Sequence, residues 1–367
     1  MSGEIRAERL TTLAAQEELD QLLVGDLVRP GDSAPGMLSN LRWLTGFTGT
    51  SGLAVVGADD RLFLTDFRYV ERAAREVAEQ FERGTVERDL LAGAANRLRG
   101  RVGYDDANTS VRSLRRLEEL APEGVELVAA AGLVERLRRR KDDDELRKIA
   151  EAAVLADQVY EWVLERGVVG RTERRIMLGA HQRMRELGAD DPSFPAIVAA
   201  GENSAMPHHG SSEREVRAGE LLLIDMGAMV DGYCSDCTRT VAAGSVEGDA
   251  QEVYELVRSA QEAALEAIRA GVAVRDADSV ARDPIVAAGH GEHFAHGLGH
   301  GVGLEVHESP RLSQTSDQVL EVGDVVTVEP GVYLRGRFGV RIEDLVTVTD
   351  TGCRNFSAFP KDLQVLD

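Results

Sequence analysis

The sequence has few cysteines and no long apolar run. Three cysteines among 367 residues cannot supply a disulfide framework, and so few thiols suit a reducing compartment. No apolar run reaches the length of a membrane-spanning helix, and residues 1–20 are charged and helix-like, without an apolar signal core. We therefore expect a soluble, cytoplasmic protein without a membrane partner.

Positive charge is also scarce. The 42 Lys and Arg residues face 63 Asp and Glu residues, which gives a formal net charge of −21. Binding to phosphate backbones needs a basic surface, so we expect no nucleic-acid partner. Cys234 and Cys237 form a C-x-x-C spacing, but a redox motif needs a helix N-terminus and this segment is predicted to be a strand. We interpret both as small packed residues beside Asp236.

The chain is long for a single core, and its 43% hydrophobic content is enough for two. In the first third, strand and helix patterns alternate, which is typical of an α/β domain. The basic run at 136–141 is interpreted as a solvated helix end or linker. We predict an N-terminal α/β domain over residues 1–138 and an α+β domain over 139–367. The predicted N-terminal strands are Leu19–Gly25, Gly52–Gly57 and Arg61–Asp66, and the helices are Tyr69–Arg83 and Asp89–Leu98.

Helices and antiparallel strands occupy separate blocks of the second domain, which indicates an α+β arrangement. Asp142–Glu145 open the first helix with carboxylates at its positive N-terminal end, and this helix ends near Arg166, where Gly167 stops it. Thr172 is expected to cap the second helix, and Pro284 to kink or shorten the fourth. Further helices are predicted at Gln251–Arg269 and Val274–Ala288, and strands at Asp324–Val348.

An Asp231-Gly232 pair between two apolar segments predicts a tight β-hairpin. With a two-residue loop, Val230 faces Tyr233 and Gly227 faces Asp236. Asp225 then becomes a diagonal neighbour of Asp236 on one sheet face, where two carboxylates repel unless a proton or a cation lies between them. In a different register, one of these Asp side chains would face solvent instead.

Other polar residues of the second domain strengthen the case for a cation. His296, His300 and His307 lie in a glycine-rich stretch, and Glu329 and Glu343 lie at or within apolar strands. A lone carboxylate in a buried strand is costly unless it is paired or metal-bound. Carboxylates with one imidazole suit Mn, Co, Fe or Zn, and bridging carboxylates indicate two ions that hold a shared water as hydroxide.

Seven motifs in a fixed order over about residues 142–360 resemble the pita-bread metallopeptidases, and within them the Xaa-Pro branch of prolidase and aminopeptidase P. Residues 40–49 and 65–69 resemble the N-terminal domain of the same branch, which methionine aminopeptidases usually lack. The motifs are Ser204–His208, Ile224–Gly227, Ser235–Thr240, 296–303, Val306–Glu308, Val328–Tyr333 and Val340–Asp344.

The resemblance implies a ligand set for two divalent ions, Mn or Co first and Zn or Fe as alternatives: Asp225, Asp236, His300, Glu329 and Glu343, with Asp236 and Glu343 bridging. The expected reaction is attack of the metal-held hydroxide on the carbonyl of an Xaa-Pro bond, in a peptide with proline second. Glu329 would take the proton and later give it to the proline nitrogen.

The resemblance also implies roles for residues around the ligands. His208 and His307 would orient the scissile carbonyl or bind the tetrahedral intermediate, and His296 would line the proline pocket. Tyr333 and Arg341 would hold the ligands in place. Relatives often have Pro-His-Gly where this chain has Pro207-His208-His209-Gly210, so His209 competes with His208 for the same role.

Two alternatives stay open from the sequence. Arg311 is placed to bind the free carboxylate of a dipeptide, but similar aminopeptidases also carry Arg there, so it does not separate the two activities. Pita-bread domains also exist as metal-free hydrolases such as creatinase, or as non-catalytic binding modules. Homodimers are common in the family, and a homodimer is expected here.

Overall fold

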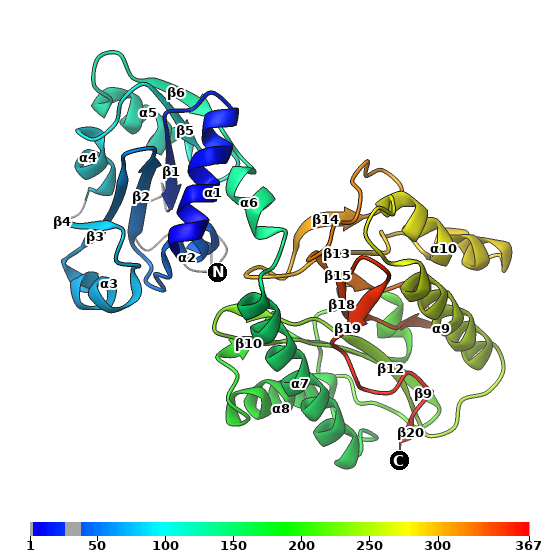
Figure 1. Cartoon of the computed structure of the whole chain (residues 1–367). Coiled ribbons are helices and arrows are strands. Elements are labelled where there is room, and N and C mark those ends of the chain that lie inside the picture. Colours follow the sequence, from blue (N-terminus) through cyan, green and yellow to red (C-terminus); the bar gives the residue numbers. More distant parts are fainter. Residues whose placement is uncertain (1–2, 26–37, 88, 367) are drawn as a thin grey trace. The chain divides into compact units, whose positions relative to one another are not determined.

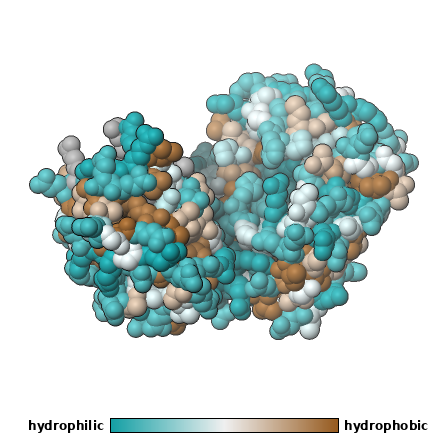
Figure 2. Space-filling view, turned by 90° about the horizontal axis from the view of Figure 1, so that it is seen from above, coloured by the Kyte–Doolittle hydropathy of each residue, from teal (hydrophilic) through white to brown (hydrophobic). Residues whose placement is uncertain are grey.

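The computed structural model describes residues 3–25, 38–87 and 89–366 of the chain (Figure 1). These residues form two compact units, Met1–Arg138 and Arg139–Asp367. The face seen in Figure 2 is mainly hydrophilic, with apolar side chains in small patches. None of the helices in the described ranges has both the length and the apolar character that a bilayer crossing requires.

The N-terminal unit is an α/β domain built on a six-stranded sheet with strand order β4-β3-β2-β1-β5-β6. β1 pairs antiparallel with β2 and parallel with β5, and Leu23, Val55 and Leu64 are buried beneath helix α4. The strands are β1 Gln21–Gly25, β2 Gly52–Gly57, β3 Arg61–Asp66, β4 Glu82–Val86, β5 Arg101–Tyr104 and β6 Glu126–Ala129. The helices are α1 Gly3–Gln16, α2 Ser39–Thr45, α3 Val70–Glu76, α4 Leu90–Ala95, α5 Val111–Leu120 and α6 Leu133–Arg138, with the short 3-10 helix η2 at Phe67–Tyr69.

The predicted helix Tyr69–Arg83 is wrong in its second half. Helix α3 ends at Glu76, and β4 begins at Glu82 and pairs in parallel with β3. The side chains of this edge strand are exposed or half-buried, so its sequence lacks the apolar alternation of a strand. Backbone pairing with β3 therefore makes residues 82–86 a strand, although the local sequence pattern predicts a helix as far as Arg83.

The C-terminal unit contains two helix pairs, each packed on a mainly antiparallel sheet, with β20 parallel to β12 in the first (Figure 1). Helices α7 and α8 bury Val159 and Ile176 against Ile224 of the sheet β20-β12-β9-β8. Helices α9 and α10 bury Val257 against Val326 of the sheet β14-β13-β15-β18-β19. The helices are α7 Asp143–Glu165, α8 Glu173–Glu186, α9 Asp249–Ala267 and α10 Val274–Ala287, with short 3-10 helices η3 at Gly201–Ala205 and η4 at Gly291–His293.

The strands of this unit are mostly short. They are β7 Asp191–Pro192, β8 Ile197–Ala200, β9 Glu220–Asp225, β10 Ala228–Val230, β11 Tyr233–Cys234, β12 Thr238–Ala243, β13 Gly299–Gly301, β14 Glu308–Leu312, β15 Val325–Val328, β16 Gly331–Leu334, β17 Phe338–Arg341, β18 Asp344–Val348, β19 Cys353–Asn355 and β20 Val365–Leu366. The α+β arrangement expected from the sequence is confirmed.

The helix ends follow the predicted signals. Asp142 accepts hydrogen bonds from the amides of Asp144 and Glu145 and so caps α7, and Thr172 caps α8 through the amide of Arg175. Pro284 neither ends nor shortens its helix, because α10 continues to Ala287.

The basic run at 136–141 is only partly solvated. Arg138 and Lys141 are buried, and Lys141 Nζ lies 3.1 Å from Glu308 Oε2. Arg139 Nη2 lies 2.6 Å from the fully buried carboxylate of Asp324. Arg138 Nη1 donates to Asn40 Oδ1 at 2.7 Å. The interpretation as a solvated linker is wrong for these three residues, because each cation has a polar partner that its local sequence does not reveal.

Candidate metal centre

The hairpin from β9 to β12 has the register predicted from its turn. Asp231 and Gly232 both have positive φ, +45° and +75°, as a tight two-residue turn requires. Val230 pairs with Tyr233 as predicted, and Asp225 pairs with Thr238 farther along. The same register on both sides places Asp236 opposite Gly227, where a Cβ atom would lie 1.8 Å from the Ser235 carbonyl oxygen. Only glycine fits this crossing, and Asp225 and Asp236 lie on one face.

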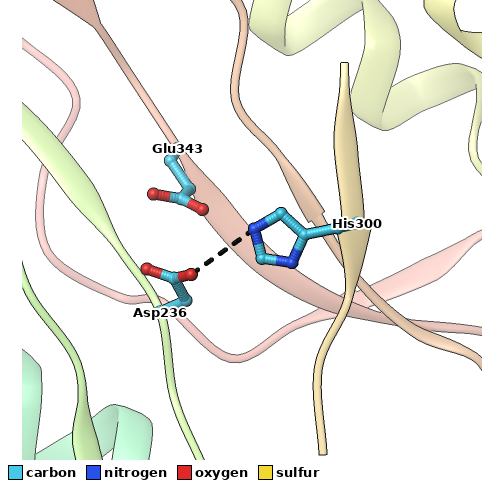
Figure 3. Close-up of side chains that lie close together, drawn as sticks. All are labelled: Asp236, His300 and Glu343. Carbon is cyan, nitrogen blue, oxygen red and sulfur yellow. Dashed lines mark ion pairs between the residues drawn. The ribbon is translucent and has the colours of Figure 1, made fainter. Parts of the chain in front are cut away.

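The second sheet brings three more polar residues toward this face. His300 lies in β13, Glu329 directly follows β15, and Glu343 lies between β17 and β18. Ligand atoms of Asp236, His300 and Glu343 lie within 4.8 Å of one another, and Figure 3 shows the two carboxylates facing the imidazole. His300 Nε2 lies 3.6 Å from Asp236 Oδ2 and 3.3 Å from Glu329 Oε1. Side chains far apart in the sequence thus form one group.

Two carboxylate oxygens of this group lack a partner. Asp225 Oδ1 and Glu343 Oε1 are buried and have no hydrogen-bond donor among the residues that the structure describes. Their second oxygens are held, Asp225 Oδ2 by Arg341 Nη2 at 2.5 Å and Glu343 Oε2 by the Thr238 hydroxyl at 2.7 Å. A buried, unpaired carboxylate oxygen is costly, and a divalent cation is the partner that suits several of them together.

The electrostatics of the group agree with this interpretation. Burial, and then the charges of Glu343, Asp225 and Glu329, raise the pKa of Asp236 well above its usual value. Burial, followed by the charges of Glu329 and Asp225, likewise raises the pKa of Glu343. Like charges held together in a dry site favour protonation unless a cation compensates them. The group therefore has the chemistry of a cation site.

The imidazole of His300 is oriented for coordination. Its Nδ1 lies 3.1 Å from the carbonyl oxygen of Gly301, so Nδ1 carries the proton and donates it there. The lone pair of Nε2 then points toward Asp236 and Glu329. Burial lowers the pKa of His300, which favours the neutral ligand form.

His296, Tyr333 and Arg341 form a chain of hydrogen bonds behind Asp225. Arg341 Nη1 donates to the Tyr333 hydroxyl at 2.8 Å, and that hydroxyl lies 3.0 Å from His296 Nε2. His296 Nδ1 lies 2.8 Å from the carbonyl oxygen of Gly297. Because Nδ1 donates there, Nε2 accepts the Tyr333 proton. All three residues are thereby fixed relative to Asp225.

The remaining predicted site residues are more exposed. His307 lies beside His300, with ring centroids 4.3 Å apart, and burial, His300 and His208 all lower its pKa. Arg311 is exposed on β14, paired in register with His300. His208 is exposed, whereas His209 Nε2 lies 2.8 Å from the buried carboxylate of Glu173. This geometry separates the two neighbouring histidines and leaves His208 available to a ligand.

Comparison with known proteins identifies the family. The model of "Metallopeptidase family M24" matches residues 147–350, which is more than half of the chain. The chain belongs to metallopeptidase family M24. The model of the "Creatinase/Prolidase N-terminal domain" matches residues 6–140 of the same chain. The fold expected from the sequence is thereby confirmed in both domains.

Relatives of this M24 chain match it along its whole length. An uncharacterized peptidase, YqhT of Bacillus subtilis, is 37% identical over 99% of this chain and 100% of its own. The structure of an Xaa-Pro dipeptidase from Bacillus anthracis has a TM-score of 0.94 and 35% identity, and covers 100% of both chains. An X-Pro aminopeptidase from Thermotoga maritima has a TM-score of 0.88 and 32% identity, and covers 98% of this chain and 100% of its own.

Two threonines at the M24 site were not singled out from the sequence. Thr238 donates to Glu343 and accepts a hydrogen bond from Arg341 Nε at 3.0 Å. Thr327 accepts the amide of His300 at 3.1 Å and donates to Glu329 Oε1 at 3.1 Å. Each lies two residues after or before a candidate ligand, on the same strand face, and that spacing is the signal that could have found them.

Proposed function

We propose that this M24 chain hydrolyses the peptide bond that precedes proline in Xaa-Pro peptides, with two divalent metal ions bound to Asp225, Asp236, His300, Glu329 and Glu343. The observation that carries the proposal is the pair of buried carboxylate oxygens, on Asp225 and Glu343, to which no described residue donates a hydrogen bond. They lie beside an imidazole with its Nε2 lone pair directed into the same group. The names of the dipeptidase and aminopeptidase relatives supply the substrate class.

A bound metal pair would supply a nucleophile by lowering the pKa of a water molecule. Asp236, His300 and Glu343 would hold the ions together, since their ligand atoms lie within 4.8 Å of one another. Burial raises the pKa of Glu329, which suits a carboxylate that takes a proton and passes it to the leaving proline nitrogen. His307 and His208 would donate hydrogen bonds to the carbonyl oxygen as its charge develops.

The donor set of four carboxylates and one neutral imidazole favours Mn or Co, with Zn or Fe as alternatives. Reconstitution of the purified chain with each metal, followed by assay on Leu-Pro, Gly-Pro and an Xaa-Pro-Pro tripeptide, tests the proposal. We expect metal-dependent cleavage of at least one of these substrates. If the metal-loaded protein cleaves none of them, the proposed activity is wrong.

The competing function is that of a metal-free hydrolase or a non-catalytic binding module. All five ligand positions are filled by carboxylate or imidazole side chains, which favours the metallopeptidase. Elemental analysis of protein purified without chelator separates the two functions. A folded chain that takes up no divalent ion would support the competitor.

Substitution of Arg311 tests whether its side chain binds the free carboxylate of a dipeptide. Its side chain is exposed and lies near enough to lower the pKa of His300, although burial dominates that shift. If Arg311 binds the free carboxylate of a dipeptide, Arg311→Gln raises the KM for Leu-Pro by about tenfold, the loss of one charge-assisted pair, and leaves tripeptide hydrolysis nearly unchanged. Equal effects on both substrates would contradict this role. A homodimer and a cytoplasmic location stay predictions.

A further inference from the structure

The buried carboxylate of Glu173 has no role in the proposed chemistry. It nevertheless accepts more hydrogen bonds from the described residues than the carboxylate of Asp225 or Glu343 does. Glu173 begins helix α8 and is 0% exposed. Its Oε1 accepts the amide of Ala200 at 2.8 Å and the side-chain amide of Asn203 at 2.9 Å. Its Oε2 accepts the amide and hydroxyl of Ser212, at 3.0 and 2.6 Å, and His209 Nε2 at 2.8 Å.

These donors enclose a single segment. Ala200 and Ser212 lie at its two ends, and Asn203 and His209 lie within it. One ionised carboxylate therefore closes the segment 200–212 into a loop against the start of α8, and we call this segment the His208 loop. Charge-assisted hydrogen bonds of this kind are short and geometrically specific.

The far side of the His208 loop is held by the strand that leads to the metal centre. Ser204 Oγ accepts the amide of Gly339 at 2.7 Å, and a Cβ atom on Gly339 would lie 2.0 Å from the Ser204 carbonyl oxygen. The carbonyl oxygen of Pro207 lies 3.4 Å from Arg341 Nη1, on the guanidinium that holds Asp225. His208 follows directly, and it is exposed. The loop is thus fixed on both sides of His208, whose imidazole is exposed.

We propose that Glu173 is a positioning residue that sets the place of His208 through the His208 loop, and that His209 serves as its anchor in that loop. This inference rests on the proposed function, in which His208 contacts the scissile carbonyl. The two adjacent histidines then have different roles. His209 holds the loop to Glu173, and His208 contacts the substrate. A displacement of about 1 Å at such a group can lower a rate by about a hundredfold.

A double-mutant cycle tests whether Glu173 acts through His208. We expect Glu173→Gln to lower kcat on the best Xaa-Pro substrate by about tenfold, with KM changed less than about twofold. In a His208→Asn background the same change should cost less than about twofold, because the group it positions is gone. Glu213→Gln, on an exposed side chain of the adjoining segment, is the matched control and should leave kcat unchanged.

Hydrogen exchange on the metal-free protein gives a readout independent of activity. Glu173→Gln should speed amide exchange over residues 200–212 and leave α9 and α10 unchanged. If Glu173→Gln does not fold, His209→Asn replaces it in both experiments, since it removes one donor from the partly exposed side of the cluster.

The inference would be overturned if the factors by which Glu173→Gln and His208→Asn lower kcat simply multiplied in the double variant. Unchanged amide exchange in the His208 loop of Glu173→Gln would also overturn it. The inference would also be overturned if His209→Asn lowered kcat by the same factor in the His208→Asn background as in the wild type. Failure of the wild type to cleave any Xaa-Pro substrate would instead contradict the proposed function, so the two failures are distinguishable.

Discussion

Glu343 and Asp344 are neighbours in the sequence and differ completely in their surroundings. Asp344 is 0% exposed and accepts hydrogen bonds from Arg239 Nη2 at 2.8 Å, Lys361 Nζ at 2.9 Å, and the side-chain amides of Asn355 and Gln261 at 2.8 and 3.1 Å. Glu343 accepts one hydrogen bond, from Thr238, and its Oε1 has no donor in the described part of the chain.

The difference separates a structural ion cluster from a binding site. Burial would raise the pKa of Asp344, but Arg239 and Lys361 hold it below its usual value. For Glu343, burial and nearby carboxylates both raise the pKa. Two consecutive residues, Glu343 just before β18 and Asp344 at its start, therefore point an uncompensated and a compensated carboxylate in different directions. The uncompensated carboxylate is the one that a bound cation would stabilise.

Removing the uncompensated carboxylate should have the largest effect on activity. Glu343→Gln removes a proposed metal ligand, and we expect kcat/KM to fall by about a thousandfold or more under metal saturation. The metal-free variant should unfold at no lower denaturant concentration than the wild type, because a repulsive charge has been removed. Near-normal activity would contradict the ligand assignment.

Breaking the compensated cluster should instead affect stability. Arg239→Leu leaves Asp344 buried without its main cation, and we expect a loss of about 3–5 kcal/mol in the free energy of unfolding. Urea unfolding of metal-free protein measures this loss, with Glu343→Gln as the matched control. If the two substitutions lowered the free energy of unfolding equally, Asp344 and Glu343 would not differ in the way proposed.

The guanidinium of Arg341 should give an intermediate effect. It donates to Asp225, Thr238 and Tyr333, and lysine cannot reproduce that fork of donors. We expect Arg341→Lys to weaken metal affinity by about 10–100-fold, as for other residues that orient a ligand. Metal titration monitored by calorimetry measures the change. An unchanged dissociation constant would show that Asp225 needs no such support.

The pH dependence of stability should have opposite signs for the uncompensated and compensated carboxylates, and this is the smallest effect. In metal-free protein the folded chain binds protons more tightly than the unfolded chain at Asp236 and Glu343, because their pKa values are raised from 3.8 and 4.5. Their contribution to the free energy of unfolding therefore falls as pH rises from the usual pKa values toward and through the raised pKa values of the folded chain.

Asp344, whose pKa is lowered from 3.8, behaves in the opposite way and loses its contribution as pH falls through the lowered value. Unfolding curves from about pH 2 to pH 8, which reach the ranges of both groups, compare metal-free wild type with Glu343→Gln. The variant should show a smaller fall in stability with rising pH. Identical slopes would contradict the raised pKa of Glu343.

The sequence predicts the parts of this site that depend on local rules. The Asp231-Gly232 turn sets a register that places Asp225 beside Asp236 with no reference to any family, and Asp142 and Thr172 predict their helix starts. The candidates His300, Glu329 and Glu343 stand out as polar residues in apolar or glycine-rich segments, and the ordered motifs make them specific.

Long-range partners could not be predicted in this way. Asp344 and Glu343 both carry a carboxylate, and only the folded chain brings Arg239 and Lys361 to one of them. The same holds for Lys141, whose partner Glu308 is far along the chain, and for Glu173, which organises a loop that begins 27 residues later at Ala200. Local pattern also fails at β4, where pairing with β3 outweighs helical periodicity.

The number of divalent ions bound per folded chain tests the central claim most directly. Metal-free protein is titrated with Mn and with Co, and bound metal is measured by elemental analysis after removal of the excess. The account predicts two ions per chain in the wild type and a reduced number in Glu343→Gln. A folded wild-type chain that binds no divalent ion would contradict it.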